Sequence, residues 1–418
     1  MLPRAMGTSG LLVVVVCCGM AQPPRAPLPP NTTASVSPQF VARTATGKVF
    51  NGAITRLNPD FSVAMDTGTV AAGELVTLRR QEVLLPPLPA ESYVEFANGD
   101  RLTGEVLGIA NDKVRFRARL SRDGGVLSIA DVTIPLPALS LIWFRTPPVE
   151  MRHRLPTSWA AERRRRDLVL MQNGDLRRGT VKSLDEPLGS LTLLEDGKET
   201  RLVAGQVVAV ALNTDLARTL RPRGTYGRLV LANGSRLSVL EPSVQALSLQ
   251  AKTLFGANLQ WRLEEIVSLE VLQGRAVFLS DLKPIQYEHQ PYLGVQWPYV
   301  MDRSVVGQPL RLGGNVYDKG IGMHSQSRLT FNLEGQYRRF ESWVGLDDVS
   351  GQGGRVMIRV LADDIPVGGD LGEVSSIHGP RFVEADITGK KKLTLVVEFG
   401  AAGDVCDHVN WCDARLVR

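Results

Sequence analysis

Short runs of alternating apolar and polar residues follow one another along this chain, separated by turns that contain glycine. The same order recurs at residues 46–52, 98–104 and 173–179, with a looser copy at 233–237. Each copy continues with a second alternating run and a closing apolar strand, as at residues 139–144, 206–210 and 266–271. A period of two places alternate side chains on one face of a strand. The pattern predicts an all-β chain with internal repeats.

The repeats predict small, strongly bent antiparallel barrels. Asn-Gly between two alternating runs indicates a two-residue hairpin of type I′. A glycine four or five residues beyond the turn, such as Gly104, is typical of a sharp bend in the strand. A unit of about 45 residues with four or five strands fits an SH3-like or Sm-like shape. Some Sm-like barrels bind RNA, but shape does not decide function, and a scaffold role is favoured here.

Composition divides the chain further. We expect the following order: a signal peptide at 1–21, a Pro/Ser/Thr-rich linker at 22–44, β repeats at 45–90 and 91–146, a Pro/Arg-rich linker at 147–166, β repeats at 167–215 and 225–273, and a C-terminal module at 284–418.

The N-terminal residues predict export. Arg4 precedes the apolar run 10–18, and the small residues Gly19 and Ala21 follow it, which is the layout of a secretory signal peptide. The run is shorter than the about 20 residues that a membrane-spanning helix needs. Val16 before Cys17 disfavours a lipid anchor. We expect a protein without a membrane span, secreted or in the periplasm or cell envelope.

The C-terminal third carries the densest motifs. Residues 317–325, 344–348 and 407–416 are rich in Gly, Asp, His and Trp and lie between short alternating strands. Such turns predict a β-sandwich, or jelly roll, whose loops present polar groups beside aromatic rings. Sugar-binding surfaces have this composition.

These motifs resemble the NPCBM domain family, a carbohydrate-binding module first noted in glycoside hydrolase family 98. The resemblance covers about residues 291–418. Its ordered landmarks are 292–298, 302–304, 309–310, 319–325, 333–337 with Phe340, 345–348 and 407–416. The resemblance implies a galactose-binding-like jelly roll that binds carbohydrate without catalysis by the module itself. Residues 364–369 replace a polar and aromatic loop, and Asn410 stands where members often carry Asp, which leaves the particular sugar open.

A pyranose has an apolar face that an aromatic ring can cover and hydroxyls that polar side chains can bind. The candidate carbohydrate-binding residues are Trp297, Tyr317, His324, Asp347, Asp348, Asp407, His408, Asn410 and Trp411. Each has a structural alternative. His324 can cap a loop, Trp411 can pack in the core, and Trp343 is predicted to pack there.

Two further features leave alternatives open. Cys406 and Cys412 either form a disulfide or remain free thiols, since spacing alone does not show their geometry. Asp347-Asp348 and Asp363-Asp364 offer oxygen ligands for a structural calcium ion, although without EF-hand spacing. No other cofactor is predicted, and zinc lacks a ligand set.

Charge is uneven along the chain. Residues 284–418 carry 14 Lys and Arg against 17 Asp and Glu. The remaining residues, 1–283, carry 34 Lys and Arg against 26 Asp and Glu. The basic excess favours an anionic polysaccharide or envelope surface as a partner, and export disfavours nucleic acid. The arginine run 163–166 is either a solvated linker face or a contact for such a polymer.

Catalytic motifs are missing from the sequence. It contains no G-x-S-x-G, H-E-x-x-H or phosphate-binding glycine loop, and no alternation of strands and helices. We therefore predict an exported, non-catalytic carbohydrate-binding protein. A glycoside hydrolase or its accessory part, and an envelope scaffold that binds another protein, are the alternatives.

Overall fold

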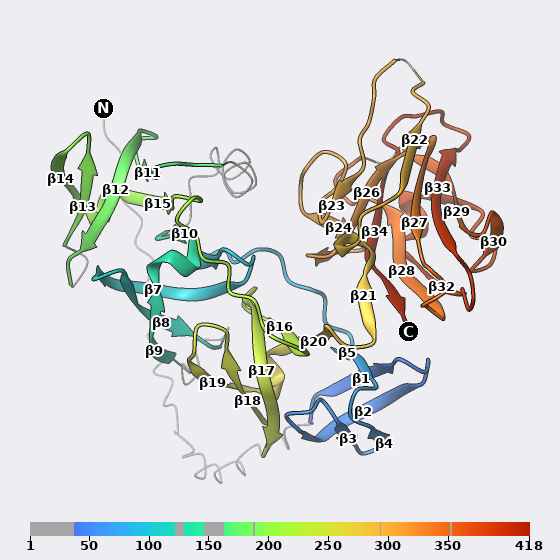
Figure 1. Cartoon of the computed structure of the whole chain (residues 1–418), viewed down its shortest axis with the longest axis horizontal. Coiled ribbons are helices and arrows are strands. Elements are labelled where there is room, and N and C mark those ends of the chain that lie inside the picture. The colour runs from blue at the N-terminus through green and yellow to red at the C-terminus, as the bar shows by residue number, and fades with distance from the viewer. Residues whose placement is uncertain (1–36, 122–128, 146–162, 187–188, 293, 352) are drawn as a thin grey trace, which may run out of the picture. The chain divides into compact units, whose positions relative to one another are not determined.

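The computed structural model describes residues 37–121, 129–145, 163–186, 189–292, 294–351 and 353–418. These residues form antiparallel β-sheets joined by turns and short 3-10 helices (Figure 1), which confirms the predicted all-β class. The predicted signal peptide and most of both predicted linkers lie outside the described residues. Within the described ranges, no helix is long and apolar enough to cross a membrane.

The first twenty strands form four groups of five. They are β1 (Gln39–Thr44), β2 (Val49–Leu57), β3 (Val63–Met65), β4 (Gly68–Val70) and β5 (Leu75–Arg80); β6 (Tyr93–Phe96), β7 (Arg101–Ala110), β8 (Lys113–Arg119), β9 (Ile129–Pro135), η1 (Leu136–Ala138) and β10 (Leu139–Trp143); β11 (Asp167–Met171), β12 (Leu176–Leu184), β13 (Ser190–Glu195), β14 (Lys198–Val203), η2 (Ala204–Gln206) and β15 (Val207–Ala211); β16 (Tyr226–Leu231), β17 (Arg236–Gln245), β18 (Ser248–Thr253), β19 (Asn258–Arg262), η3 (Leu263–Glu265) and β20 (Ile266–Leu272).

Each group is a small barrel, numbered 1 to 4 in chain order. Its first strand pairs with both the second and the fifth, and the second, third and fourth follow as a meander. The last strands of different barrels also pair: β5 with β20, and β10 with β15. The inward side chains of all four barrels form one continuous apolar cluster. The predicted tandem barrel-like repeats are therefore present, while the exact domain boundaries remain predictions.

The turn after the first strand of each barrel differs from the predicted type I′ hairpin. Gly99 has φ +85°, but Asn98 is absent from the residues with positive φ. Phe96 N donates to Asp100 O and Gly99 N donates to Phe96 O, which closes a three-residue turn ending in a left-handed glycine. The Asn98 Oδ1 atom accepts from Asp100 N at 3.2 Å. The type I′ prediction was wrong because this side chain stabilises the turn without a positive φ at asparagine.

Gly104 shows why the following strand bends. Its φ is +151°, and a Cβ atom there would lie 2.1 Å from Arg117 O of the neighbouring strand β8. The pairing of β7 with β8 also shifts register between Val106 and Gly108. A side chain at this position would separate the two strands where the barrel bends most.

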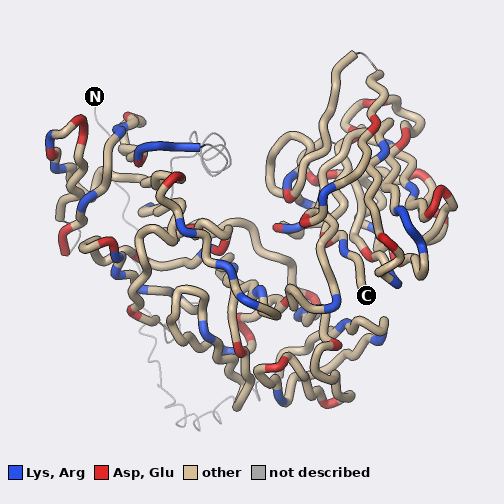
Figure 2. Tube along the Cα trace, viewed as in Figure 1, with Lys and Arg blue, Asp and Glu red and all other residues tan. Residues whose placement is uncertain are grey.

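Two predicted linker segments contain ordered structure. Strand β1 begins at Gln39 and therefore lies within residues 22–44, which were predicted to be a linker. Phe40 and Ala42 of this strand are buried in the core. Arg164 is 6% exposed and donates to Leu212 O, and Arg163 and Arg166 pair with Asp215 and Asp196. The arginine run therefore packs against barrel 3 instead of forming a wholly solvated face. Figure 2 shows basic and acidic positions interspersed along the strands.

The C-terminal strands form the predicted sandwich. They are β21 (Ala276–Phe278), η4 (Leu279–Asp281), β22 (Gln286–His289), β23 (Val300–Met301), β24 (Leu310–Leu312), β25 (Asn315–Tyr317), β26 (Gly320–His324), β27 (Ser327–Asn332), β28 (Arg339–Leu346), β29 (Arg355–Ala362), β30 (Ile365–Val367), β31 (Glu373–Ser375), η5 (Ser376–His378), β32 (Arg381–Asp386), β33 (Lys392–Phe399) and β34 (His408–Val417).

The sandwich has two antiparallel sheets. The first has the order β23-β26-β34-β28-β32, with β21 beside β34, and the second has the order β22-β27-β33-β29-β30, with β31 beside β29. Their inner faces enclose an apolar core that includes Phe331, Phe340 and Trp411. The outer face of the first sheet packs against the barrels through an apolar cluster that includes Leu85, Val267 and Leu310.

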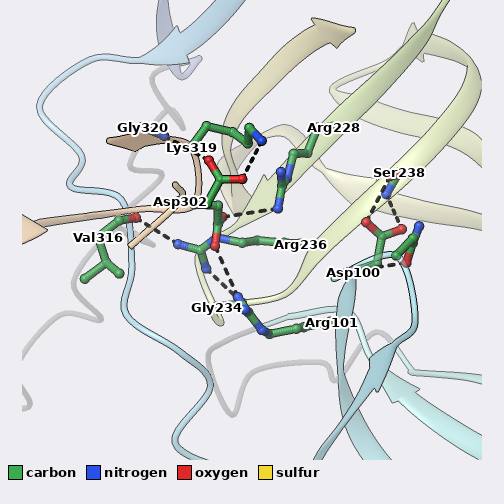
Figure 3. Close-up of polar contacts among 12 residues, drawn as sticks. Asp100, Arg101, Arg228, Gly234, Arg236, Ser238, Asp302, Val316, Lys319 and Gly320 are labelled. Carbon is green, nitrogen blue, oxygen red and sulfur yellow. Dashed lines mark hydrogen bonds and ion pairs between the residues drawn. The ribbon is translucent and has the colours of Figure 1, made fainter. Parts of the chain in front are cut away.

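A buried ion cluster joins the sandwich to the barrels (Figure 3). Asp318, between β25 and β26, pairs with Arg101 at 3.2 Å, Arg228 at 3.6 Å and Arg236. The Arg236 side chain is 1% exposed and also donates to Val316 O at 3.0 Å. Burial alone would raise the pKa of Asp318, but the three guanidinium groups hold this pKa well below its ordinary value.

Replacing this carboxylate tests the cluster. Asp318→Asn leaves three buried guanidinium groups without their shared anion, so we expect the free energy of unfolding to fall by about 3–5 kcal/mol at pH 7. Denaturant unfolding followed by circular dichroism measures this loss. Because the folded-state pKa is depressed, the contribution is present above about pH 4 and is lost as the pH falls below it.

Asp281→Asn is the matched control. Asp281 pairs with Lys319 at 2.7 Å, but its side chain is 53% exposed, so its loss should cost less than about 1 kcal/mol. Equal losses in the two variants would contradict the stabilising role of the buried cluster.

Candidate functional site

The candidate site lies where β26 and β28 end and β34 begins. Strand β34 is antiparallel to both neighbours, pairing His408 with His324 and Val409 with Leu346. Arg355 N, at the start of β29 in the second sheet, donates to Asp407 Oδ1 at 3.1 Å, which ties the second sheet to this end. We call the connecting segments the loop rim: residues 290–292, 294–299, 347–351, 353–354, 376–380 and 400–407.

Three rings meet on the loop rim and form what we call the ring cluster: Trp297, His324 and His408. The Trp297 indole stacks on the His324 imidazole with centroids 4.6 Å apart and planes 4° apart. His408 lies 5.5 Å from each of the other two rings. The Tyr287 hydroxyl donates to Trp297 O and holds this segment against β22. The structure thus brings together three of the predicted site residues.

Both histidines of the ring cluster favour the neutral form. Burial, followed by the nearby His408, lowers the pKa of His324 to about 4. Burial also lowers the pKa of His408, and the Asp347 carboxylate opposes that shift. A neutral imidazole offers one N–H donor and one acceptor nitrogen, which suits the hydroxyl groups of a ligand.

Asp347 and Asn410 form a buried pair beneath the ring cluster. Asn410 Nδ2 donates to Asp347 Oδ2 at 2.7 Å and to Arg311 O at 3.2 Å. Asp347 also accepts from Val349 N at 2.9 Å, and burial raises its pKa. Asn410 is fully buried and Asp347 is 2% exposed, so their geometry makes them positioning residues for this loop.

Asp348 and Asp407 also make internal hydrogen bonds. Asp348 accepts from Gly313 N at 2.8 Å and Gly314 N at 2.9 Å, which fixes the β24–β25 turn. Asp407 is fully buried, and burial raises its pKa to about 6 although hydrogen bonds from Ser325 and Arg355 act in the opposite direction. Asp348 therefore ties the loop rim to the β24–β25 turn, and Asp407 ties it to the start of β29.

Two predicted aromatic contacts lie elsewhere. Trp411 is fully buried and packs beside Phe340, at 6.4 Å, in the sandwich core. Tyr317 is 5% exposed and packs with Leu85 and Val267 at the junction with the barrels. Neither ring face is available on the loop rim. Trp343, which was predicted to pack in the core, instead lies on the outer face of the first sheet beside Phe382.

Of the two alternatives for Cys406 and Cys412, the structure has the free thiols. Residues 408–412 run extended within β34, which adds roughly 13 Å between the two cysteines. A disulfide needs Cα atoms within about 7 Å.

The carboxylates predicted as calcium ligands do not converge. Asp347-Asp348 follows the end of β28 on the loop rim, whereas Asp363-Asp364 follows β29 at the opposite end of the sandwich. Asp363 accepts from Lys391 N and Lys392 N. Among the described residues, no group of three or more His, Cys, Asp or Glu side chains has metal-binding geometry.

A cavity of about 430 Å³ opens on the loop rim. Its lining combines apolar and polar groups: Leu312, Gly313, Leu346, Asp347, Asp348, Gly351, Ser375, Ser376, Ile377, Gly379 and Pro380. This volume falls within the range of small-ligand sites. Sequence reasoning missed residues 375–380, because a Ser-rich turn with one glycine has no distinctive pattern. It also missed His289, which lies 6.3 Å from His324 and is preceded only by an ordinary alternating run.

Residues 275–417 match the family described as NPCBM/NEW2 domain. The C-terminal sandwich is an NPCBM domain. The family match covers about a third of the chain and does not include the barrels.

Solved structures similar to this chain include CBM51 from Clostridium perfringens GH95 in complex with methyl-galactose. That structure shares 31% identity, with 34% of this chain and 99% of that chain covered and a TM-score of 0.31. The tandem CBM51 modules of Sp3GH98, a family 98 glycoside hydrolase from Streptococcus pneumoniae, share 13% identity over 78% of this chain and 88% of that chain, with a TM-score of 0.28.

A curated relative from Renibacterium salmoninarum is named "Putative endo-alpha-N-acetylgalactosaminidase". It is 23% identical over 247 residues, which cover 58% of this chain. The chain spans 14% of the length of that relative.

The pKa shifts in the NPCBM domain predict compensating pH effects. Protonation of His324 favours unfolding, so its contribution is present above about pH 6.5 and is lost as the pH falls toward 4. The contribution of Asp407 has the opposite sign, being present below about pH 3.8 and lost as the pH rises through about 6.

Asp407→Asn removes one of these two effects. As the pH falls from 6 to 4, we expect the free energy of unfolding of this variant to decrease more steeply than that of the wild type. The loss from His324 protonation, up to about 3 kcal/mol, is then no longer offset by Asp407. Urea unfolding at a series of pH values measures both slopes. The double variant with His324→Gln should flatten the curve again, and parallel curves for all three proteins would contradict the assignment.

Proposed function

We propose that this chain is an exported, non-catalytic carbohydrate-binding protein whose NPCBM domain binds a glycan on the loop rim. The observation that carries the proposal is the ring cluster on the rim of a domain of this family. The rim cavity beside Asp347 and Asp348, which the three rings do not line, offers further space for a glycan on the same rim.

Trp297 is the proposed stacking residue. One face of its indole covers His324, so a pyranose ring would pack against the other face. His408 would exchange hydrogen bonds with ligand hydroxyls through its neutral imidazole. Asp347, Asp407 and Asn410 would act indirectly, because their internal hydrogen bonds hold the loops in place.

The internal roles of these carboxylates support a binding function rather than catalysis. A glycosidase needs two carboxyl groups that flank the scissile bond, whereas Asp347, Asp348 and Asp407 each accept backbone hydrogen bonds. Export rests on the sequence pattern of residues 1–21, which lie outside the described residues. The basic excess of residues 1–283 supports a contact with an anionic envelope surface.

Removing the stacking ring tests the proposal. Trp297→Ala should weaken binding to the best glycan on an array about 5-fold or more, because ring stacking contributes on the order of 1 kcal/mol or more. Trp297→Phe keeps a ring face and is the matched control, so it should retain most of the binding. Full binding by a folded Trp297→Ala protein would refute the site.

The glycosidase-named relative favours a second candidate, in which the chain belongs to a glycoside hydrolase as its accessory or catalytic part. We expect the purified chain to release no reducing ends from the polysaccharides or glycans that it binds. Release above that of a heat-denatured sample, measured by a reducing-sugar assay, would favour this candidate. A blank array together with co-purification of one envelope protein would favour a scaffold.

A further inference from the structure

A second cavity, of about 460 Å³, lies between the NPCBM domain and barrels 1 and 4. We call it the seam cavity because one wall is the ladder that joins β5 to β20. That ladder pairs Thr77 with Glu270 and Arg79 with Ser268, and all four residues line the cavity. The opposite wall is the outer face of the first sheet, with Trp343, Phe382, Asp413 and Arg415, together with Tyr317 of β25.

The wall from the first sheet is aromatic. Trp343 and Phe382 are cross-strand neighbours on β28 and β32, with ring centroids 5.1 Å apart and planes tilted by 54°. Both rings remain partly exposed. The Arg43 guanidinium covers Phe382 at 4.6 Å, whereas the Trp343 indole lines the cavity. Flat apolar surfaces of this kind suit the C–H face of a ring-shaped ligand.

The wall from the barrel ladder is polar. Ser268 is 1% exposed, and its hydroxyl has no hydrogen-bond partner among the described residues. Glu270 is 8% exposed beside it. Buried polar groups normally have partners, which makes this hydroxyl the unsatisfied polar group of the barrel wall. Across the cavity, burial and the Glu270 carboxylate raise the pKa of Asp413 to about 7.

Four arginines line the seam cavity, and each already has a partner. The Arg43 guanidinium lies over the Phe382 ring, and Arg80 donates to Glu264 O. Arg79 Nη2 donates to Asn315 Oδ1 at 2.8 Å and to Val83 O at 3.2 Å. Arg415 pairs with Glu341, its cross-strand neighbour on β28. The other polar groups of the two walls include the Ser268 hydroxyl and the carboxyl groups of Glu270 and Asp413, which accept hydrogen bonds and disfavour an anion.

We propose that the seam cavity is a second saccharide-binding site, which takes one neutral pyranose unit. Trp343 stacks on the sugar ring, and Ser268, Glu270 and Asp413 bind its hydroxyls. The sugar class rests on the proposed carbohydrate-binding function, whereas the position of the site differs from that of the rim cavity, with which it shares only Pro380. The cavity needs residues of barrel 1, barrel 4 and the NPCBM domain together, so this site belongs to the whole chain and not to the domain alone.

Calorimetric titration of the full chain with methyl-galactoside tests this site. We expect two binding sites per chain in the wild type. Glu270→Gln, which keeps the side-chain shape, and Ser268→Ala should each weaken one of the two at least 10-fold. Trp343→Leu should abolish the same site, and thermal unfolding shows whether each variant remains folded.

Trp297→Ala is the control that separates the two sites. In that variant the seam site should persist and respond to Glu270→Gln as in the wild type. If the wild type has one site that Trp297→Ala removes and Glu270→Gln and Ser268→Ala leave unchanged, the seam proposal fails while the rim proposal stands. If Glu270→Gln removes all binding and Trp297→Ala removes none, the rim proposal fails instead. Absence of any binding to the wild type overturns the neutral-pyranose assignment for the seam cavity.

Discussion

The arrangement of this chain depends on one carboxylate, that of Asp318, buried among three guanidinium groups. Arg101 comes from barrel 2, and Arg228 and Arg236 come from barrel 4, so a single residue of the NPCBM domain ties two barrels to it. A buried charge is tolerated only where its partners are in place, and this restricts how the domain can sit on the barrels. Strand β26 then leads from this cluster to His324 on the loop rim, at its opposite end.

The packing of the NPCBM domain against the barrels leaves its tryptophans Trp297, Trp343 and Trp411 in three different environments. Trp411 faces the core, Trp343 faces the barrels and Trp297 lies on the loop rim. A bulge with Asp413 at φ +49° shifts the pairing of β34 with β28, and it decides which residues after Trp411 face the barrels. Burial of Trp411 strengthens the core, whereas the partly exposed Trp343 and Trp297 remain free to contact ligands.

Residue types predicted much of the candidate site. They did not predict which residues lie exposed on the rim and which hold the loops through internal hydrogen bonds. The motifs at 317–325, 344–348 and 407–416 indicated which turns carry polar and aromatic groups. Trp297, His324 and His408 do meet on one rim. Asp347, Asp407 and Asn410 lie close by, but their hydrogen bonds go to the protein itself. Among the described residues, Asp407 Oδ2 and Asn410 Oδ1 have no hydrogen-bond partner. Residue type alone could not separate these two uses.

The sequence by itself determined the all-β class, the tandem barrels and the C-terminal sandwich, because alternation and glycine turns are local properties of a strand. It also determined the family of the sandwich through an ordered series of landmarks. Only the tertiary structure decided that Tyr317 faces the barrels, that Cys406 and Cys412 stay apart, and that Ser268 and Trp343 line one cavity. Residues 75 positions apart in the chain meet there because packing is a long-range property, and no local pattern encodes which faces come together.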